Sequence, residues 1–117
     1  MGVVTSKRSG HARRALELTG VAGRFAFVLG PDECPAHKPD PAPVAQGCAE
    51  LGLAPARCLY VGDSPFDIQA GNGAGCATAA ALWGMFPPEA LAAEEPTFTL
   101  ESMAELPVLA RRLAAGR

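Results

Sequence analysis

The sequence has no excess of positive charge, no paired cysteine motif and no long hydrophobic run. Its 10 basic and 12 acidic side chains give a net charge of −2, so we expect no broad basic face for nucleic acid or an anionic membrane. The apolar stretch Cys76–Trp83 is far too short to span a bilayer. A secretory leader, with a charged region followed by an apolar one, is also absent. These absences predict a cytoplasmic protein that binds neither nucleic acid nor membrane.

The four cysteines form no pattern that is typical of a metal site. Cys34, Cys48, Cys58 and Cys76 are spaced 14, 10 and 18 residues apart and include no C-x-x-C pair, so their spacing does not suggest zinc. We expect small, mostly buried thiols in a reducing compartment. A disulfide is the alternative that an even cysteine count leaves open.

Length and composition predict one α/β domain over residues 1–117. Apolar residues make up 49% of the chain and charged residues 19%, which allows a packed core. Strand-length apolar runs alternate with helical patterns, and this alternation indicates parallel βαβ units in a three-layer α/β sandwich. The predicted strands are Val3–Val4, Phe25–Leu29, Arg57–Gly62, Ala77–Leu82 and Thr97–Thr99. The predicted helices are Ser9–Thr19, a segment from an Asp40 N-cap and Pro41 to Gly52, Pro65–Gly75 (ended by Gly71, Gly73 and Gly75), Pro88–Glu94 and Leu106–Ala115.

Polar side chains follow several of these strands. Ligands of such sheets bind beyond the carboxyl ends of the strands, where we place Thr5 and Ser6, Lys38, and the pair Asp63 and Asp67. Hydroxyl, ammonium and carboxylate groups suit phosphoryl chemistry with Mg²⁺, because carboxylates hold the metal while the cation and hydroxyl stabilise phosphate oxygens. Asp63 is the candidate that is hardest to explain by a purely structural role. It follows a buried strand, and no lysine or arginine nearby in sequence is positioned to neutralise its charge.

Each of the other candidates has a purely structural explanation. Asp67 stands three residues after Ser64, so the two could form a capping box at a helix start. Thr5 and Ser6 could close a turn through their own backbone, and Lys38 in its loop could be a solvated charge. The spacing alone leaves these alternatives open.

Three motifs together resemble the haloacid dehalogenase superfamily of phosphohydrolases. They are VVTSK at 3–7, HKPDP at 37–41 and LYVGDSPFDIQAGNGAG at 59–75. Their order and spacing match the family over essentially the whole chain, and are most similar to its phosphoglycolate phosphatase and pyrophosphatase branch.

The resemblance implies a role for each candidate. Thr5, with Ser6, would bind the transferred phosphoryl group of a small phosphorylated substrate, and Lys38 would steady that group and the nucleophile. Thr5 and Lys38 are thus the implied catalytic residues. Asp63 would be a Mg²⁺ ligand, and Asp67 would support the metal directly or through water while also capping its helix.

The chain departs from the family at the nucleophile. The family's D-x-D motif lies on a strand before the threonine motif, whereas no two aspartates of this chain are spaced two apart. That strand is central in the family's sheet, so its absence predicts two unpaired strand edges facing a gap. The family's helical cap domain is missing too.

Two hypotheses follow from the missing strand. In the first, the chain is the C-terminal part of a Mg²⁺-dependent phosphohydrolase, inactive alone, and a missing N-terminal segment fills the gap. In the second, it is a non-catalytic metal- or phosphate-binding module that closes the gap by forming a homodimer. A response-regulator receiver is disfavoured, because its acidic pair would precede the threonine and lysine.

Overall fold

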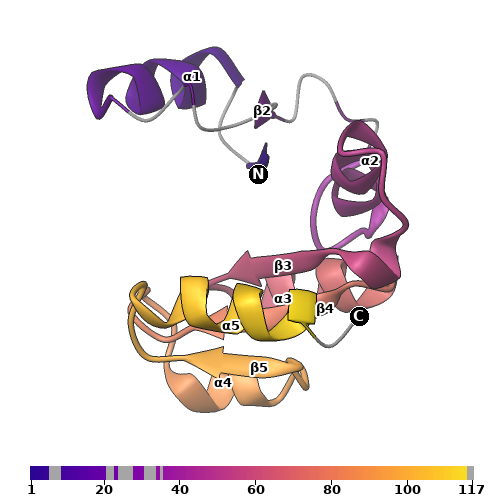
Figure 1. Cartoon of the computed structure of the whole chain (residues 1–117), viewed down its shortest axis with the longest axis vertical. Helices are drawn as coiled ribbons and strands as arrows, with labels where there is room; N and C mark the ends of the chain where they lie inside the picture. Colours follow the sequence, from indigo (N-terminus) through magenta and orange to yellow (C-terminus); the bar gives the residue numbers. More distant parts are fainter. Residues whose placement is uncertain (6–8, 21–22, 24–27, 31–33, 35, 116–117) are drawn as a thin grey trace.

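A computed structural model describes residues 1–5, 9–20, 23, 28–30, 34 and 36–115 of the chain (Figure 1). The elements in these ranges are β1 (Val3–Val4), α1 (Ser9–Leu18), β2 (Val28–Leu29), α2 (Ala42–Glu50), η2 (Pro55–Arg57, a 3₁₀ helix), β3 (Leu59–Gly62), α3 (Pro65–Ala74), β4 (Ala77–Ala81), α4 (Pro88–Ala92), β5 (Phe98–Leu100) and α5 (Glu105–Ala115). None of the helices in these ranges is long and apolar enough to cross a membrane.

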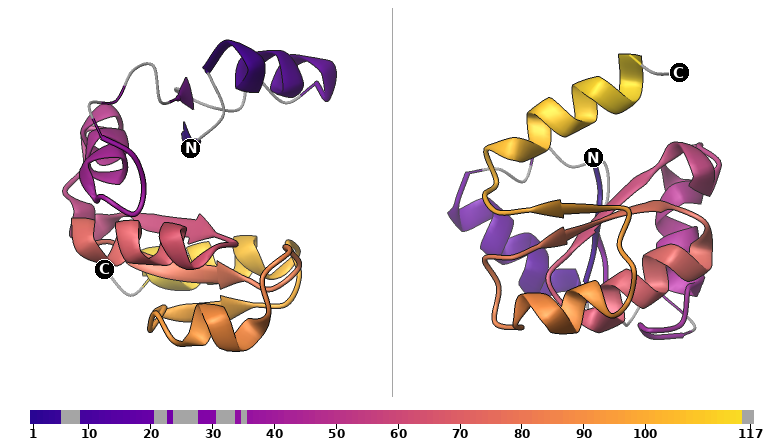
Figure 2. Two further views of the ribbon diagram at one scale, coloured as in Figure 1. Left: turned by 180° about the vertical axis from the view of Figure 1, so that it is seen from behind. Right: turned by 90° about the horizontal axis from the view of Figure 1, so that it is seen from below.

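The described strands form two separate parallel sheets. β1 pairs with β2, and β3, β4 and β5 form a three-stranded sheet in that order. Helices α3 and α4 cover one face of the larger sheet and α5 covers the other, as the view from below shows (Figure 2). The predicted three-layer α/β arrangement is therefore confirmed. Of the strand predicted over Phe25–Leu29, residues 25–27 lie outside the described residues and the rest is β2.

The alanine-rich strand β4 is buried on both faces. One cluster joins Ala80 with Ile68 of α3 and Leu91 of α4, and another joins Ala79 with Leu100 and Leu109. A small side chain lets helices approach the sheet closely from both sides, which explains why a strand here is built from a residue that prefers helices. Full burial of Ile68 alone, which is 0% exposed, contributes about 1.5–3 kcal/mol.

Two predicted boundaries were wrong. The strand expected from Arg57 begins at Leu59, because Pro55–Arg57 forms a 3₁₀ turn in which the Arg57 N–H donates to the Ala54 carbonyl (2.9 Å). The N-cap of α2 is Pro41 and not Asp40. The Asp40 carboxylate instead accepts a hydrogen bond from the backbone N–H one residue beyond Pro41 (2.8 Å), a short turn of the kind aspartate favours. Other element ends shift by one or two residues.

Only one of the three glycines expected to end α3 does so. Gly75 ends it in the left-handed region (φ +91°), where its N–H donates to the Asn72 carbonyl. Gly71 and Gly73 lie inside the helix. At Gly71 an added Cβ would lie 2.6 Å from the methyl carbon of Thr78 and 3.0 Å from the Tyr60 ring, so this glycine serves close packing of α3 on the sheet.

Candidate active site

An ion pair between Lys38 and Asp67 forms the centre of the candidate site. Lys38 lies in the loop before α2, and Asp67 lies in the first turn of α3. The Lys38 Nζ donates to Asp67 Oδ1 at 2.6 Å, and each side chain is 13% exposed. The alternative of Lys38 as a solvated charge is therefore wrong. Because the pair is largely shielded from water, removing one partner should cost more than breaking a surface salt bridge.

The start of α3 fixes the position of Asp67. Its Oδ2 accepts hydrogen bonds from the backbone N–H groups of Asp63 and Ser64, both at 3.2 Å, and the Ser64 hydroxyl accepts one from the Asp67 N–H at 3.2 Å. This is the capping box that the sequence predicts, with Pro65 at the first helical position. One carboxylate oxygen caps the helix while the other faces Lys38, so the structural role of Asp67 leaves room for a second one.

Two glycines make room for the two carboxylates. A Cβ on Gly62 would overlap the Asp67 side chain, coming within 2.9 Å of Oδ2, and one on Gly84 would lie 2.6 Å from both Cβ and Oδ2 of Asp63. Any larger residue would displace the aspartate. Neither glycine was predicted from the sequence to belong to the site. The role of Gly62 could have been predicted from its position between the strand and Asp63. Gly84 is distant in sequence and reaches the site only through the fold.

Tyr60 is a further site residue that the sequence analysis missed. Its hydroxyl accepts a hydrogen bond from Lys38 Nζ at 3.3 Å, and the ammonium lies 5.9 Å from the ring centroid. Burial raises the pKa of Tyr60; the positive charge of Lys38 opposes this, and the charge of Asp67 adds to it. Tyr60 is therefore a neutral hydroxyl at pH 7 that helps to orient the ammonium.

The surroundings of Lys38 favour its charged form. Burial lowers its pKa, but the nearby Tyr60 oxygen and the hydrogen bond and charge of Asp67 outweigh that effect and leave the pKa above its ordinary value. Lys38 consequently remains a cation over the whole physiological range. A fixed, permanently charged ammonium suits the binding of phosphate oxygens.

The two aspartates differ in how accessible their oxygens are. Asp63 is exposed next to the sheet edge, whereas both oxygens of Asp67 already accept hydrogen bonds. Mg²⁺ is commonly held by one or two carboxylates, with water and substrate phosphate completing its octahedron. The donor set fits that pattern: Asp63 is available as a direct ligand, and Asp67 is better placed to act through water. The described residues contain no cluster of three metal-binding side chains, so these residues supply only part of a coordination shell.

The structure places Thr5 apart from the other candidate residues. Thr5 directly follows β1, and its N–H donates to the Leu29 carbonyl at 2.9 Å, an extension of the β1–β2 pairing. Ser6 lies outside the described residues. The structure thus brings Lys38 and Asp67 into direct contact, with Asp63 in the same turn, and places Thr5 at the end of a different sheet.

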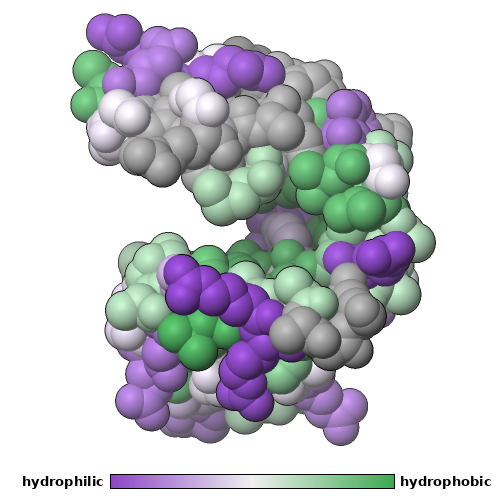
Figure 3. All heavy atoms as spheres, viewed as in Figure 1, coloured by the Kyte–Doolittle hydropathy of each residue, from purple (hydrophilic) through white to green (hydrophobic). Residues whose placement is uncertain are grey.

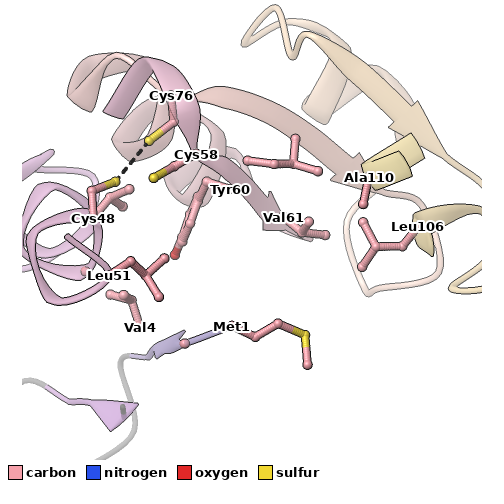
Figure 4. Close-up of a pocket in the computed structure, with 14 residues that line it drawn as sticks. Met1, Val4, Cys48, Leu51, Cys58, Tyr60, Val61, Cys76, Leu106 and Ala110 are labelled. Carbon is pink, nitrogen blue, oxygen red and sulfur yellow. Dashed lines mark hydrogen bonds between the residues drawn. The ribbon is translucent and has the colours of Figure 1, made fainter. Parts of the chain in front are cut away.

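A largely apolar cavity of about 380 Å³ lies between the two sheets. Val4 of β1 and its neighbours Met1 and Gly2 line one side, while Tyr60 and Val61 of β3 line the opposite side (Figure 4). The space-filling view is hollowed at this place (Figure 3). Within the described ranges, β1 pairs with β2 and β3 with β4, and no pairing joins β1 to β3. This is the gap between two strand edges that the sequence predicts.

Comparisons with known proteins agree with this architecture. The family model described as "Haloacid dehalogenase-like hydrolase" matches residues 1–81. The chain is 37% identical over 91% of its length to the pyrophosphatase PpaX of Bacillus velezensis, and covers 49% of that protein. It is 35% identical over 91% of its length to the phosphoglycolate phosphatase of Pasteurella multocida, and covers 47% of it.

Solved structures give the same result. The crystal structure described as a predicted phosphoglycolate phosphatase from Haemophilus somnus superimposes with a TM-score of 0.85 at 33% identity, over 92% of this chain and 48% of that one. The chain thus spans about half the length of the relatives that it matches. Since the family model matches more than half of the chain, this protein belongs to the haloacid dehalogenase-like hydrolase family.

Proposed function

We propose that this chain is the C-terminal part of a Mg²⁺-dependent phosphohydrolase that acts on a small phosphate monoester such as phosphoglycolate, or on diphosphate. The relatives named above supply the substrate classes. The observation that carries the proposal is the apolar cavity between the unpaired edges of β1 and β3. Beside it lies a site that contains the Lys38 ammonium and the carboxylates of Asp63 and Asp67.

The described residues supply groups for binding and charge stabilisation. The Lys38 ammonium, held by Asp67 and Tyr60, would neutralise charge on the phosphate oxygens. The Thr5 hydroxyl, with Ser6, would bind the transferred phosphoryl group. Asp63 would hold Mg²⁺, which polarises the phosphoryl group when bound, and Asp67 would support the metal through water.

The attacking group would come from outside residues 1–117. The chain has no D-x-D sequence, and without an attacking carboxylate it cannot form a covalent phosphoryl intermediate. A strand entering the cavity could pair with β1 on one side and β3 on the other, which would satisfy both edges. We expect the chain to be inactive until such a strand is present.

The test is complementation by a peptide. The chain is mixed with a synthetic strand peptide, an apolar run followed by Asp-x-Asp-Gly-Thr, and release of phosphate from phosphoglycolate and from diphosphate is measured with Mg²⁺. We expect turnover with the peptide, none with the chain alone, and none with a peptide in which asparagine replaces the first aspartate. Lys38→Ala should abolish the complemented activity. Equal activity of the chain with and without peptide would refute the proposed origin of the nucleophile.

The same cavity also favours a second candidate, a non-catalytic module that dimerises. The edges of β1 and β3 could be covered by a second copy of the chain instead of a separate segment. Sedimentation equilibrium distinguishes the two candidates, because a stable, folded monomer that takes up the peptide argues against the dimer. A tight dimer that excludes the peptide argues against the phosphohydrolase.

A further inference from the structure

Three thiols gather at one end of the cavity. Cys48 belongs to α2, Cys58 precedes β3 and Cys76 precedes β4, and the three are only 5%, 8% and 8% exposed. All three line the cavity (Figure 4). In the chain alone, with no added strand in the cavity, small molecules can therefore reach these thiols through the cavity although the outer surface hides them.

Two of these thiols are close enough to react with each other. The Cys48 and Cys76 Sγ atoms lie 3.5 Å apart, so they must approach by about 1.5 Å to reach the length of a disulfide bond. Both side chains belong to one packed cluster with Val44 and Ala70, which keeps α2 next to the junction of α3 and β4. Cys58 lies beside this pair, since its thiol hydrogen-bonds with that of Cys48, and its Sγ also lies 3.5 Å from the Ala54 carbonyl oxygen.

We propose that Cys48 and Cys76 are an oxidation site that closes to an intramolecular disulfide on reaction with a low-molecular-weight disulfide such as oxidised glutathione. The Cys48 thiolate attacks one sulfur of the reagent, the reagent's S–S bond breaks, and one small thiol leaves. The Cys76 thiolate then attacks the Cys48 sulfur of the mixed disulfide and the second small thiol leaves. The protein loses two hydrogens and two electrons, and the reagent is reduced to two thiols.

The new bond would tie α2 to the start of β4. It joins residues 28 apart in sequence, and a cross-link over such a loop restricts the unfolded chain more than the folded one. We expect the melting temperature to rise by roughly 5–15 °C on oxidation and to return on reduction. Because α2 and β3 line the same cavity, the bond would also fix the spacing of these two cavity walls.

The experiment treats the full chain with oxidised glutathione at mildly alkaline pH, because burial raises the pKa of both thiols and the thiolate is the reacting species. Intact mass should fall by two hydrogens, and a non-reducing peptide map should join the segments of Cys48 and Cys76. Cys34→Ser should leave the reaction unchanged. Cys48→Ala and Cys76→Ala should each abolish the loss of two hydrogens, and circular dichroism checks that they fold.

Three results would overturn the proposal. One is stable glutathione adducts on Cys48 or Cys76 without ring closure. Another is a disulfide that contains Cys58. The third is that Cys48 and Cys76 both remain free thiols in the peptide map of a sample in which the same reagent has modified Cys34.

Discussion

Replacing Asp67 by alanine should destabilise the protein strongly, because this carboxylate joins two structural features. Its Oδ1 pairs with Lys38 at 2.6 Å, and its Oδ2 accepts from the N–H groups of Asp63 and Ser64. A hydrogen bond between charged groups contributes about 1.5–3 kcal/mol, and loss of helix capping costs about 1 kcal/mol. We therefore expect Asp67→Ala to lower the free energy of unfolding by about 2.5–4 kcal/mol, a large part of the stability of a typical domain.

Two milder variants separate the contributions. Asp67→Asn keeps an oxygen for capping but loses the charge, so it should cost about 2 kcal/mol. Ser64→Ala removes only the hydroxyl that accepts from the Asp67 N–H, and should cost about 1 kcal/mol.

Urea unfolding followed by far-UV circular dichroism measures these differences. For Asp67→Ala the urea midpoint should fall by about 1.3–2 M at a slope near 2 kcal/mol per M. A double-mutant cycle with Lys38→Met isolates the ion pair. If Asp67→Ala lies within about 0.5 kcal/mol of the unmodified chain, the residue is not held as described and the reasoning fails.

Two other changes test the surroundings of the site. Gly84→Ala should push Asp63 aside, since the added carbon would lie 2.6 Å from its Oδ2, and we expect Mg²⁺ affinity measured by calorimetry to fall about tenfold or more. Gly10→Ala, at which an added Cβ meets nothing within 4 Å, is the matched control and should leave that affinity unchanged. Tyr60→Phe keeps the ring but removes the acceptor for Lys38, and should lower the free energy of unfolding by about 1 kcal/mol in urea; an unchanged midpoint would mean that the 3.3 Å contact contributes nothing.

The sequence predicted the capping box because that motif depends on local spacing. A serine, a proline and an acidic residue within four positions are enough to determine how α3 begins. The alternation of short strands and helices likewise gave the layers and the parallel sheet. The buried alanine strand β4 was identified by its flanking residues and not by propensity.

Contacts between distant segments could not be predicted in the same way. Tyr60 and Lys38 are 22 positions apart, and Gly84 approaches Asp63 because β3 and β4 are parallel neighbours whose carboxyl ends lie side by side. Local patterns carry no information on such approaches. The 3₁₀ turn at Pro55–Arg57 was missed for a different reason, since a basic residue beside an apolar run was assigned to the strand.

The arrangement of the two sheets indicates which part of the site would depend on the proposed additional strand. Lys38, Asp63 and Asp67 are held by the start of α3, the neighbouring loop and β3, and all their described contacts lie within residues 38–84. Thr5 instead follows β1, which pairs with β2 across the cavity from β3. A strand paired with both edges would fix the distance between Thr5 and Lys38 without altering the Lys38–Asp67 pair. Binding of Mg²⁺ to the chain alone should therefore survive, while phosphoryl transfer should require the strand that brings the two halves into register.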